Sequence, residues 1–223
     1  MLLFDVEGRE VNVEVTGVVI AGWTGRNKEA VQHHIDELAA IGVAPPSTVP
    51  LFYRAARTQA VQSDSIEVLG GETSGEVEPV LVMTEDGLIL TIGSDHTDRA
   101  LEAHSVALSK QISAKPLGRS AWRFDVAADN DSIALSSMIS NDGSIWTPYQ
   151  DGTLAAIQPL SSLFAGAEQA LDGFPVGTVM YCGTLPVLTP KITPSRFFKA
   201  DIRRPDGATL ALQYTAETLP IIV

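Results

Sequence analysis

Two glutamates open an aliphatic run in the middle of the chain. Glu76 and Glu78 stand two residues apart, directly before Pro79–Val82. Side chains alternate between the two faces of a strand, so both carboxylates point to one side and Val77 to the other. Two like charges this close are unfavourable unless a cation or a proton lies between them. The spacing therefore predicts oxygen ligands for a hard divalent metal ion. The simpler alternative is an exposed edge strand with two solvated glutamates.

A second polar segment, G-S-D-H-T-D-R, spans Gly93–Arg99. Asp95 is the candidate third oxygen ligand for the metal, and helix N-capping is its alternative role. Asp98 has the same ambiguity, because acids are favourable in a first helical turn. Lys110 closes the helix predicted after this segment. It is either a solvated lysine near a helix C-terminus or a cation that neutralises a substrate carboxylate or enolate.

The first predicted helix carries a histidine–glutamate pair. At 100° per residue His34 falls between Val31 and Leu38 and faces inward, whereas His33 points away. Glu37 lies one turn after His34 and can contact it. A carboxylate that orients an imidazole is the arrangement of a general base. The alternative is an ordinary pair on the helix surface.

Near the end of the chain, the segment Val179–Pro186 reads as a strand that leaves through Gly183 and Thr184. A backbone N–H and a hydroxyl at this point can bind an oxyanion or a carboxylate. The alternative is an ordinary turn, which the segment alone does not exclude.

Composition bounds the class of protein. The chain has 223 residues, 45% of them hydrophobic, which predicts one domain over residues 1–223 with a sizeable core. A formal net charge of −12 without a basic cluster argues against nucleic acid as a partner. No apolar run approaches a membrane span, the N-terminus does not read as a signal peptide, and Cys182 is the only cysteine. We therefore expect a cytoplasmic protein.

Strand patterns outnumber helical ones and do not alternate with them, which favours an α+β, β-rich fold over a doubly wound sheet. Residues 1–23 read as a hairpin region with a turn at Gly8–Arg9, and residues 24–223 as the catalytic core. The elements expected in the core are a helix over Lys28–Ile41 capped by Asn27 and Gly42, a strand at 49–54, strands within Ile66–Ile92, a helix over Thr97–Ser109, a loop at Lys115–Gly118, strands within 122–150 with a turn at Asn141–Gly143, a helix over Ser161–Leu171 and a final β region.

Taken in order, these segments resemble the fumarylacetoacetate hydrolase family. The family's G-x-N-Y-x-x-H-x-x-E-M segment is similar to G-R-N-K-E-A-V-Q-H-H-I-D-E-L, in which His34 and Glu37 keep the H-x-x-E spacing. Its P-x-x-F-x-K-P segment resembles V-P-L-F-Y-R-A, with Arg54 where lysine is usual. Its E-V-E-L strand is matched by E-V-E-P, which implies that Glu76 and Glu78 are metal ligands.

Three further segments continue the resemblance. The family's D-M-T-A-R-D is similar to D-H-T-D-R-A, which implies Asp95 as third ligand and brings Arg99 into register. K-S-F-D-x-x-x-P-L-G resembles K-Q-I-S-A-K-P-L-G and places Lys110 at the active-site lysine. G-D-V-I-x-T-G-T-P resembles G-T-V-M-Y-C-G-T-L-P and makes Thr184 a substrate-binding candidate. The match spans roughly residues 22–186. It departs from the family at His96, Asp98, Gln111 and Arg54, and no tyrosine follows Asn27.

The resemblance implies a mixed β-roll with stacked sheets, a homodimer, and a Mg²⁺ or Mn²⁺ site, with Ca²⁺ as a third candidate. Family members cleave C–C bonds in acylpyruvates by hydrolysis, decarboxylate oxaloacetate-like acids, or hydrate and isomerise related 2-oxo acids. In this chain His34, oriented by Glu37, would activate water, and Lys110 would stabilise the enolate with the metal. Arg54, Arg99, Gly183 and Thr184 would hold the anionic ends of a small 2-oxo or dicarbonyl acid.

Three functional hypotheses follow. The first is a metal-dependent hydrolase that cleaves a C–C bond in a 2-oxo or β-dicarbonyl acid. The second is a decarboxylase, hydratase or isomerase that uses the same metal and enolate but depends less on His34 and Glu37. The third is a non-enzymatic binding protein of the same fold. Both enzymes would bind a divalent metal ion, so an absence of metal binding would favour the non-enzymatic protein.

Overall fold

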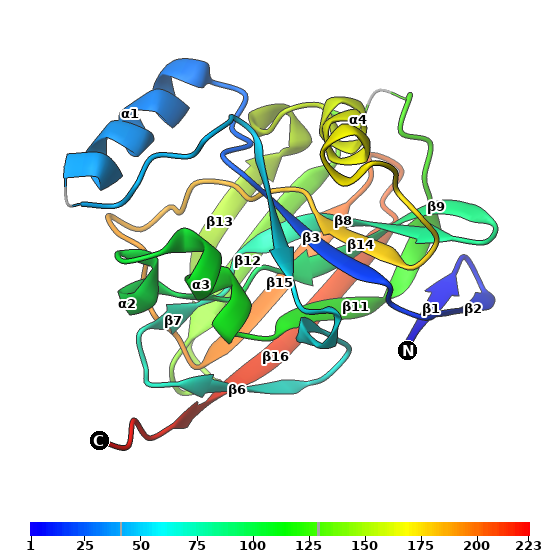
Figure 1. Cartoon of the computed structure of the whole chain (residues 1–223). Helices are drawn as coiled ribbons and strands as arrows, with labels where there is room; N and C mark the ends of the chain where they lie inside the picture. Colours follow the sequence, from blue (N-terminus) through cyan, green and yellow to red (C-terminus); the bar gives the residue numbers. More distant parts are fainter. Residues whose placement is uncertain (41, 129) are drawn as a thin grey trace.

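Strands predominate in the computed structural model, which describes residues 1–40, 42–128 and 130–223 (Figure 1). The helices are α1 (Lys28–Ala40), α2 (Arg99–Glu102), α3 (Val106–Ile112) and α4 (Leu160–Leu171), with 3₁₀ turns η1 (Arg57–Gln59) and η2 (Leu154–Ala156). The strands are β1 (Leu2–Val6), β2 (Arg9–Val13), β3 (Gly17–Gly22), β4 (Leu51–Ala55), β5 (Ala60–Val61), β6 (Ser65–Leu69), β7 (Thr73–Ser74), β8 (Val77–Thr84), β9 (Gly87–Ser94), β10 (Thr97–Asp98), β11 (Lys115–Arg123), β12 (Ala134–Ser140), β13 (Thr147–Thr153), β14 (Thr178–Tyr181), β15 (Phe197–Arg203) and β16 (Thr209–Leu219).

The larger sheet has the order β2-β1-β11-β9-β8-β14-β3-β4, with β5 paired to β11. Alternation along its central strands builds two cores, because successive side chains enter opposite faces. On β8, for example, Val80 and Val82 join the cluster on one face, while Val77 and Leu81 join the cluster on the other. Glu78 lies two residues before Val80, so its carboxylate is on the same face of the sheet as Val80 and Val82.

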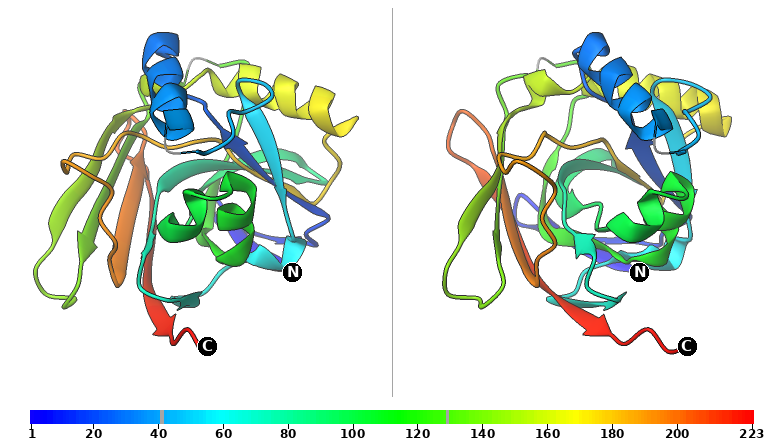
Figure 2. Two further views of the ribbon diagram at one scale, coloured as in Figure 1. Left: turned by 60° about the vertical axis from the view of Figure 1, so that its left-hand side comes forward. Right: turned by 90° about the vertical axis from the view of Figure 1, so that its left-hand side faces the viewer.

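A five-stranded sheet, β13-β12-β15-β16-β6, stacks on the second face of the larger sheet. Aliphatic and aromatic side chains from both sheets meet there, among them Leu81, Leu135 and Phe198, and α4 adds Leu163. The views in Figure 2 show the larger sheet curling around its own face, with α4 and α1 at one end. This arrangement confirms the predicted β-rich α+β class with stacked sheets.

Several elements lie where the sequence predicts them. The N-terminal hairpin forms, although its turn lies at Glu7–Gly8 and Arg9 already pairs with Val6. The helix over residues 28–40 is capped by Asn27, whose Oδ1 accepts the Ala30 N–H at 3.0 Å. Its predicted last residue, Ile41, lies outside the described residues, and Gly42 has the positive φ of 94° expected of a helix C′ glycine.

Two predictions around the candidate site are wrong. The helix expected over Thr97–Ser109 is divided into β10, α2 and α3, because Asp98 and Ser105 each cap a new helix by accepting an N–H three residues on. The loop expected at Lys115–Gly118 is the first half of β11, which pairs with β5 and β9. Lys110 therefore lies inside a short helix packed over the sheet and is buried.

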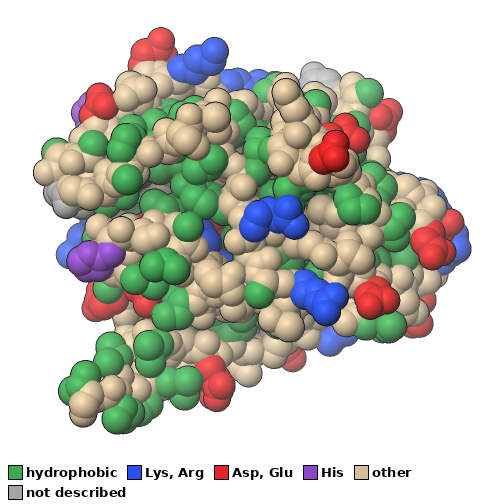
Figure 3. All heavy atoms as spheres, in the orientation of Figure 1, with side chains coloured by type: hydrophobic (Ala, Val, Ile, Leu, Met, Phe, Trp, Pro, Cys, Tyr) green, Lys and Arg blue, Asp and Glu red, His purple; other side chains and the backbone are tan. Residues whose placement is uncertain are grey.

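The chain ends in an exposed apolar segment. Leu219, Ile221, Ile222 and Val223 are all exposed, and they form the hydrophobic projection at the lower left of Figure 3, where Figure 1 marks the C-terminus. Among the described residues, no helix is long and apolar enough to cross a membrane.

Candidate metal centre

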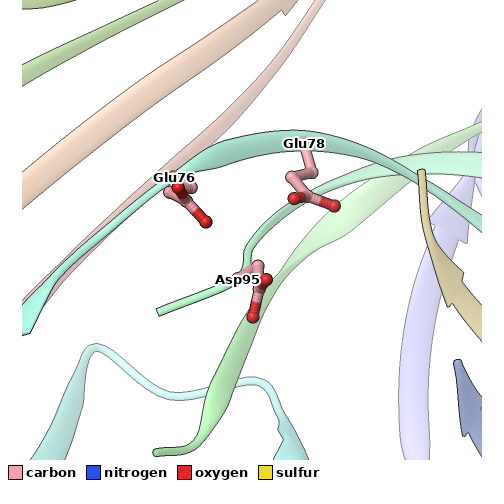
Figure 4. Close-up of side chains that lie close together, drawn as sticks. All are labelled: Glu76, Glu78 and Asp95. Carbon is pink, nitrogen blue, oxygen red and sulfur yellow. The ribbon is translucent and has the colours of Figure 1, made fainter. Parts of the chain in front are cut away.

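The three predicted carboxylate ligands meet at the end of one strand pair. Strands β8 and β9 are antiparallel with Val77 opposite Ser94, so Glu76 and Asp95 continue the pairing, and the Asp95 N–H donates to the Glu76 carbonyl at 3.1 Å. One carboxylate oxygen from each of Glu76, Glu78 and Asp95 lies within 4.8 Å of the others. Figure 4 shows Glu76 and Glu78 leaving the ribbon on the side that faces Asp95.

Three cationic side chains surround these carboxylates. Lys110 Nζ lies 2.6 Å from Asp95 Oδ2 and 3.3 Å from Glu76 Oε2. Lys115 Nζ, fully buried, lies 3.1 Å from Asp95 Oδ1. Arg99 Nη2 lies 2.9 Å from Glu76 Oε1. Within the described residues, Glu78 alone of the three carboxylates forms no ion pair.

Burial and charge act in opposite directions on the three acids. Burial raises the pKa of Glu78 well above its usual range, and the charges of Asp95 and Glu76 raise it further. Burial also works against the charge of Glu76, but Arg99 and Lys110 outweigh it and lower its pKa. In the same way Lys110 and Lys115 overcome burial and lower the pKa of Asp95. A further cation would therefore stabilise the charged form of Glu78 more than that of Glu76 or Asp95.

Gly183 and Thr184 hold the strand end in place. The Gly183 N–H donates to Glu78 Oε2 at 2.9 Å, and the Thr184 hydroxyl donates to the Val77 carbonyl at 2.8 Å. Gly183 has a φ of 99°, and a Cβ at this position would lie 1.7 Å from Thr24 Oγ1. Both predicted oxyanion donors are thus already used within the protein, and they position Glu78 and β8.

A cavity of about 1060 Å³ opens over the carboxylates. Glu76, Glu78, Asp95 and Lys110 line one end of it, and Gly183 and Thr184 also border it. Residues of α1 also line it, together with segments near residues 20–25, 155–156 and 185–192. A small molecule in this cavity can touch both the carboxylates and the helix.

The predicted histidine–glutamate pair lies at this cavity but not in the interior. His34 lines the cavity, yet its side chain is 58% exposed. Its Nδ1 is 3.6 Å from Glu37 Oε2, and His33 Nδ1 lies equally far from the other oxygen of Glu37. The expectation that His34 faces inward holds only in part, because α1 buries Ile35 and leaves both histidines exposed.

The two arginines lie outside the cavity lining. Arg54 is exposed on β4, and its neighbour Tyr53 lines the cavity instead, as the alternation of a strand requires. Arg99 is half-buried, donates hydrogen bonds to Ser74 and Glu102 at 2.8 Å, and forms an ion pair with Glu76 at 2.9 Å. The structure therefore does not bring either arginine to a substrate, and Arg99 fixes the orientation of Glu76.

Other polar residues at the site carry no clear signal in the sequence. Lys115 reads as part of a loop before P-L-G, but β11 aims it at Asp95, and its Nζ also donates to the His96 carbonyl. His96 Nδ1 is bonded to the Tyr214 hydroxyl at 2.8 Å, a residue 118 positions away. Long-range pairs of this kind depend on sheet stacking, which no local pattern reveals.

These residues fit a divalent metal ion. The donors are three carboxylates, the ligands that hard cations prefer, and they converge on one point. Glu78 is 2% exposed and has no cationic partner among the described residues, so a bound cation would stabilise its charged form.

A comparison with known protein families identifies the family of the chain. A family model described as "Protein of unknown function (DUF2848)" matches residues 21–214. The chain belongs to this family. The matched region contains all ten predicted site residues. No curated protein sequence matches the chain.

Solved structures identify the fold. A 2-keto-3-deoxyarabinonate dehydratase matches with a TM-score of 0.67 and 17% identity, over 93% of this chain and 75% of the other. The same enzyme complexed with magnesium and 2,5-dioxopentanoate matches with a TM-score of 0.64 and 17% identity, over 92% and 74%. A 4-oxalocrotonate decarboxylase from Pseudomonas putida G7, complexed with magnesium and adipate, matches with a TM-score of 0.55 and 15% identity, over 92% and 78%. The chain shares the fumarylacetoacetate hydrolase-like fold of these structures.

Proposed function

We propose that the protein is a divalent-metal-dependent enzyme that forms an enolate from a small 2-oxo or β-dicarbonyl acid. The observation that carries this proposal is the convergence of Glu76, Glu78 and Asp95 beside Lys110 at one end of a large cavity. Mg²⁺ and Mn²⁺ are the proposed metals. Magnesium complexes of two enzymes with this fold support that choice.

The metal, when bound, supplies a Lewis acid for a 2-oxo carboxylate and for the negative charge that develops on its enolate. The protein supplies the rest. Lys110 presents an ammonium group at the cavity wall, where it stabilises the same developing charge. Arg99 holds Glu76 in orientation, and the Gly183 N–H holds Glu78.

Hydrolysis of a C–C bond in an acylpyruvate-like acid is the first specific reaction we propose. It needs a base that activates water, and His34 is the histidine that lines the cavity, with Glu37 beside it. The water, having lost a proton to His34, would add to the distal carbonyl carbon, and the acyl part would leave as a carboxylic acid. The broken C–C bond would leave its electron pair on the carbon next to the 2-oxo group, and Lys110 would stabilise the resulting enolate charge. Proton transfer to that carbon completes the reaction.

Decarboxylation or dehydration of a 2-oxo acid is the second candidate. Two observations favour it: His34 is largely exposed, and its contact with Glu37 is long. Counted from Asn27, moreover, Val31 stands where the family pattern G-x-N-Y-x-x-H has histidine. Such reactions need the enolate site but no water-activating dyad.

Turnover assays test the proposal. With Mn²⁺ or Mg²⁺ present, we expect the protein to convert one class among 2,4-dioxo acids, oxaloacetate-like acids and 3-deoxy-2-oxo acids, with products identified by NMR. Chelation of the metal by EDTA should abolish the conversion. A protein that neither binds the metal nor converts any of these acids would support the non-enzymatic alternative. We also propose that residues 1–223 form one domain of a cytoplasmic protein. We propose further that the protein is a homodimer, which light scattering of the purified protein tests.

A further inference from the structure

The cavity is polar at one end and apolar over most of its remaining surface. Beyond the carboxylates and Lys110, most of the lining consists of aliphatic, aromatic and proline side chains from several segments, and Thr24, Arg26, Asn27, His34, Glu102 and Thr189 add polar groups. Among them are Ile20, Trp23, Val31, Leu38, Val187 and Ile192. A ligand that reaches beyond the carboxylates therefore meets apolar surface from several directions.

The cationic groups of the lining are already engaged. Of the described lining residues, only Arg26, His34 and Lys110 can carry a positive charge. Lys110 is held by Asp95, and Arg26 forms a two-bond pair with Asp131 at 2.6 and 2.7 Å. His34 lies beside Glu37. A second carboxylate on the ligand would have to compete with one of these acids or lie against apolar surface, which is unfavourable.

The volume also exceeds what a chelating head group needs. Sites for drug-sized ligands measure roughly 300–1,000 Å³. The cavity of about 1060 Å³ lies at the upper end of that range. A 2-oxo carboxylate alone would occupy only the end that holds Glu76, Glu78 and Asp95, so the remaining space is available to a tail.

We infer that the ligand of this site is a 2-oxo acid with an apolar tail, and that a second carboxylate at the tail end is selected against. This inference rests on the proposed function, because the 2-oxo carboxylate is the group that the metal centre would hold. Each methylene group buried in the cavity strengthens binding about fourfold.

A matched pair of probes tests the inference by titration calorimetry with Mn²⁺. In 2-oxohexanoate a methyl group stands where 2-oxoadipate has its second carboxylate, and the two are otherwise the same. We expect 2-oxohexanoate to bind at least about tenfold more tightly, and 2-oxooctanoate, with two more methylene groups, to gain about a further fifteenfold. Oxalate, which is only a chelating head, serves as the reference ligand.

Two alanines of α1 offer a matched pair of variants. Ala30 and Ala39 are both exposed, but only Ala30 lines the cavity. Ala30→Arg places a cation at the cavity wall and should restore 2-oxoadipate to at least the affinity of 2-oxohexanoate. Ala39→Arg adds the same charge outside the cavity and should leave the preference unchanged.

The binding results distinguish failure of this inference from failure of the proposed function. Metal-dependent oxalate binding together with equal or tighter binding of 2-oxoadipate by the unaltered protein would overturn the inference and leave the proposed function standing. Absence of metal-dependent binding for oxalate and all three 2-oxo acids would overturn both. Preference for 2-oxohexanoate that Ala30→Arg reverses and Ala39→Arg does not would support the inference.

Discussion

Lys110 and Asp95 form an ion pair in the interior of the protein, with 2.6 Å between Nζ and Oδ2. Asp95 is 1% exposed and Lys110 8%, so water screens the pair only weakly. Burial opposes the charge of Lys110, but Asp95 and Glu76 hold its pKa above the usual value. An ammonium group is thereby fixed at the cavity wall beside the carboxylates.

Replacement of Lys110 by methionine should reduce kcat by roughly a hundredfold or more, because the charge that stabilises the enolate is lost. Metal affinity should be kept, since Lys115 still pairs with Asp95. Steady-state kinetics and Mn²⁺ titration measure the two effects separately. The exposed Lys28 gives the control variant Lys28→Met. Normal turnover in Lys110→Met would show that its assigned role is wrong.

Replacement of Glu78 by glutamine should abolish metal binding without unfolding the protein. The amide preserves the shape of the side chain, and it removes the one carboxylate of the centre that has no cationic partner among the described residues. In the absence of metal we expect the variant to melt at an equal or higher temperature, because a neutral amide avoids the cost of burying a carboxylate beside Glu76 and Asp95. Glu67→Gln, at an exposed position of β6, is the control. Retention of tight Mn²⁺ binding by Glu78→Gln would refute the three-carboxylate site.

Lys115→Met should weaken Mn²⁺ binding by about tenfold or more while circular dichroism shows an unchanged fold. Lys115 pairs with Asp95 Oδ1 and Lys110 with Oδ2, so Lys115 helps to fix the orientation of the Asp95 carboxylate. Loss of a partner of a ligand costs roughly 10–100-fold in affinity. Calorimetric titration with Mn²⁺ measures the change. Unaltered affinity would mean that Asp95 keeps its orientation without Lys115.

His34→Ala separates the two reaction types. If the enzyme is a hydrolase, turnover should fall about a hundredfold while oxalate affinity changes little, as expected for loss of a general base. His33→Ala is the matched control, since both histidines lie 3.6 Å from Glu37 but only His34 lines the cavity. Substantial turnover in His34→Ala would favour the decarboxylase or dehydratase. Equal losses of turnover and oxalate binding would indicate a structural role.

Gly183→Ala should destabilise the protein by more than the roughly 1–3 kcal/mol of a strained φ alone. The added Cβ would meet Thr24 Oγ1 at 1.7 Å as well. Gly173→Ala controls for strain, because Gly173 also has a positive φ and no atom lies within 4 Å of a Cβ there. Urea denaturation compares the two, and Thr24→Ala should recover part of the loss only in the Gly183 variant. Similar losses in both glycine variants would argue against the clash.

The sequence is sufficient to predict that the three carboxylates lie together, because their geometry is local. Glu76 and Glu78 share a face by strand alternation, and Asp95 follows the next strand of the same hairpin. The same rule correctly sends Val77 to the opposite core. Adjacent antiparallel strands meet at their ends, so these three positions converge without any long-range information.

Where tertiary contacts decide, prediction from the sequence was less accurate. The sequence predicts a loop at Lys115, whereas the structure places it in β11. The pairing with β5 and the ion pair with Asp95 connect distant segments, which no local pattern shows. Arg54 was expected at the substrate from a motif position, whereas alternation on β4 gives that side of the strand to Tyr53. Helical periodicity predicts that His34 faces the cavity, which it lines, but it does not show that the side chain remains largely exposed.

Oxalate binding with and without Mn²⁺ tests the central claim most directly. Oxalate presents two adjacent carboxylates, so it can occupy the open positions of a metal held by Glu76, Glu78 and Asp95. We expect calorimetry to show binding in the presence of Mn²⁺, none after treatment with EDTA, and none in Glu78→Gln at any Mn²⁺ concentration tested. Binding that is equally strong without the metal, or no binding under either condition, would contradict a working metal centre at these three carboxylates.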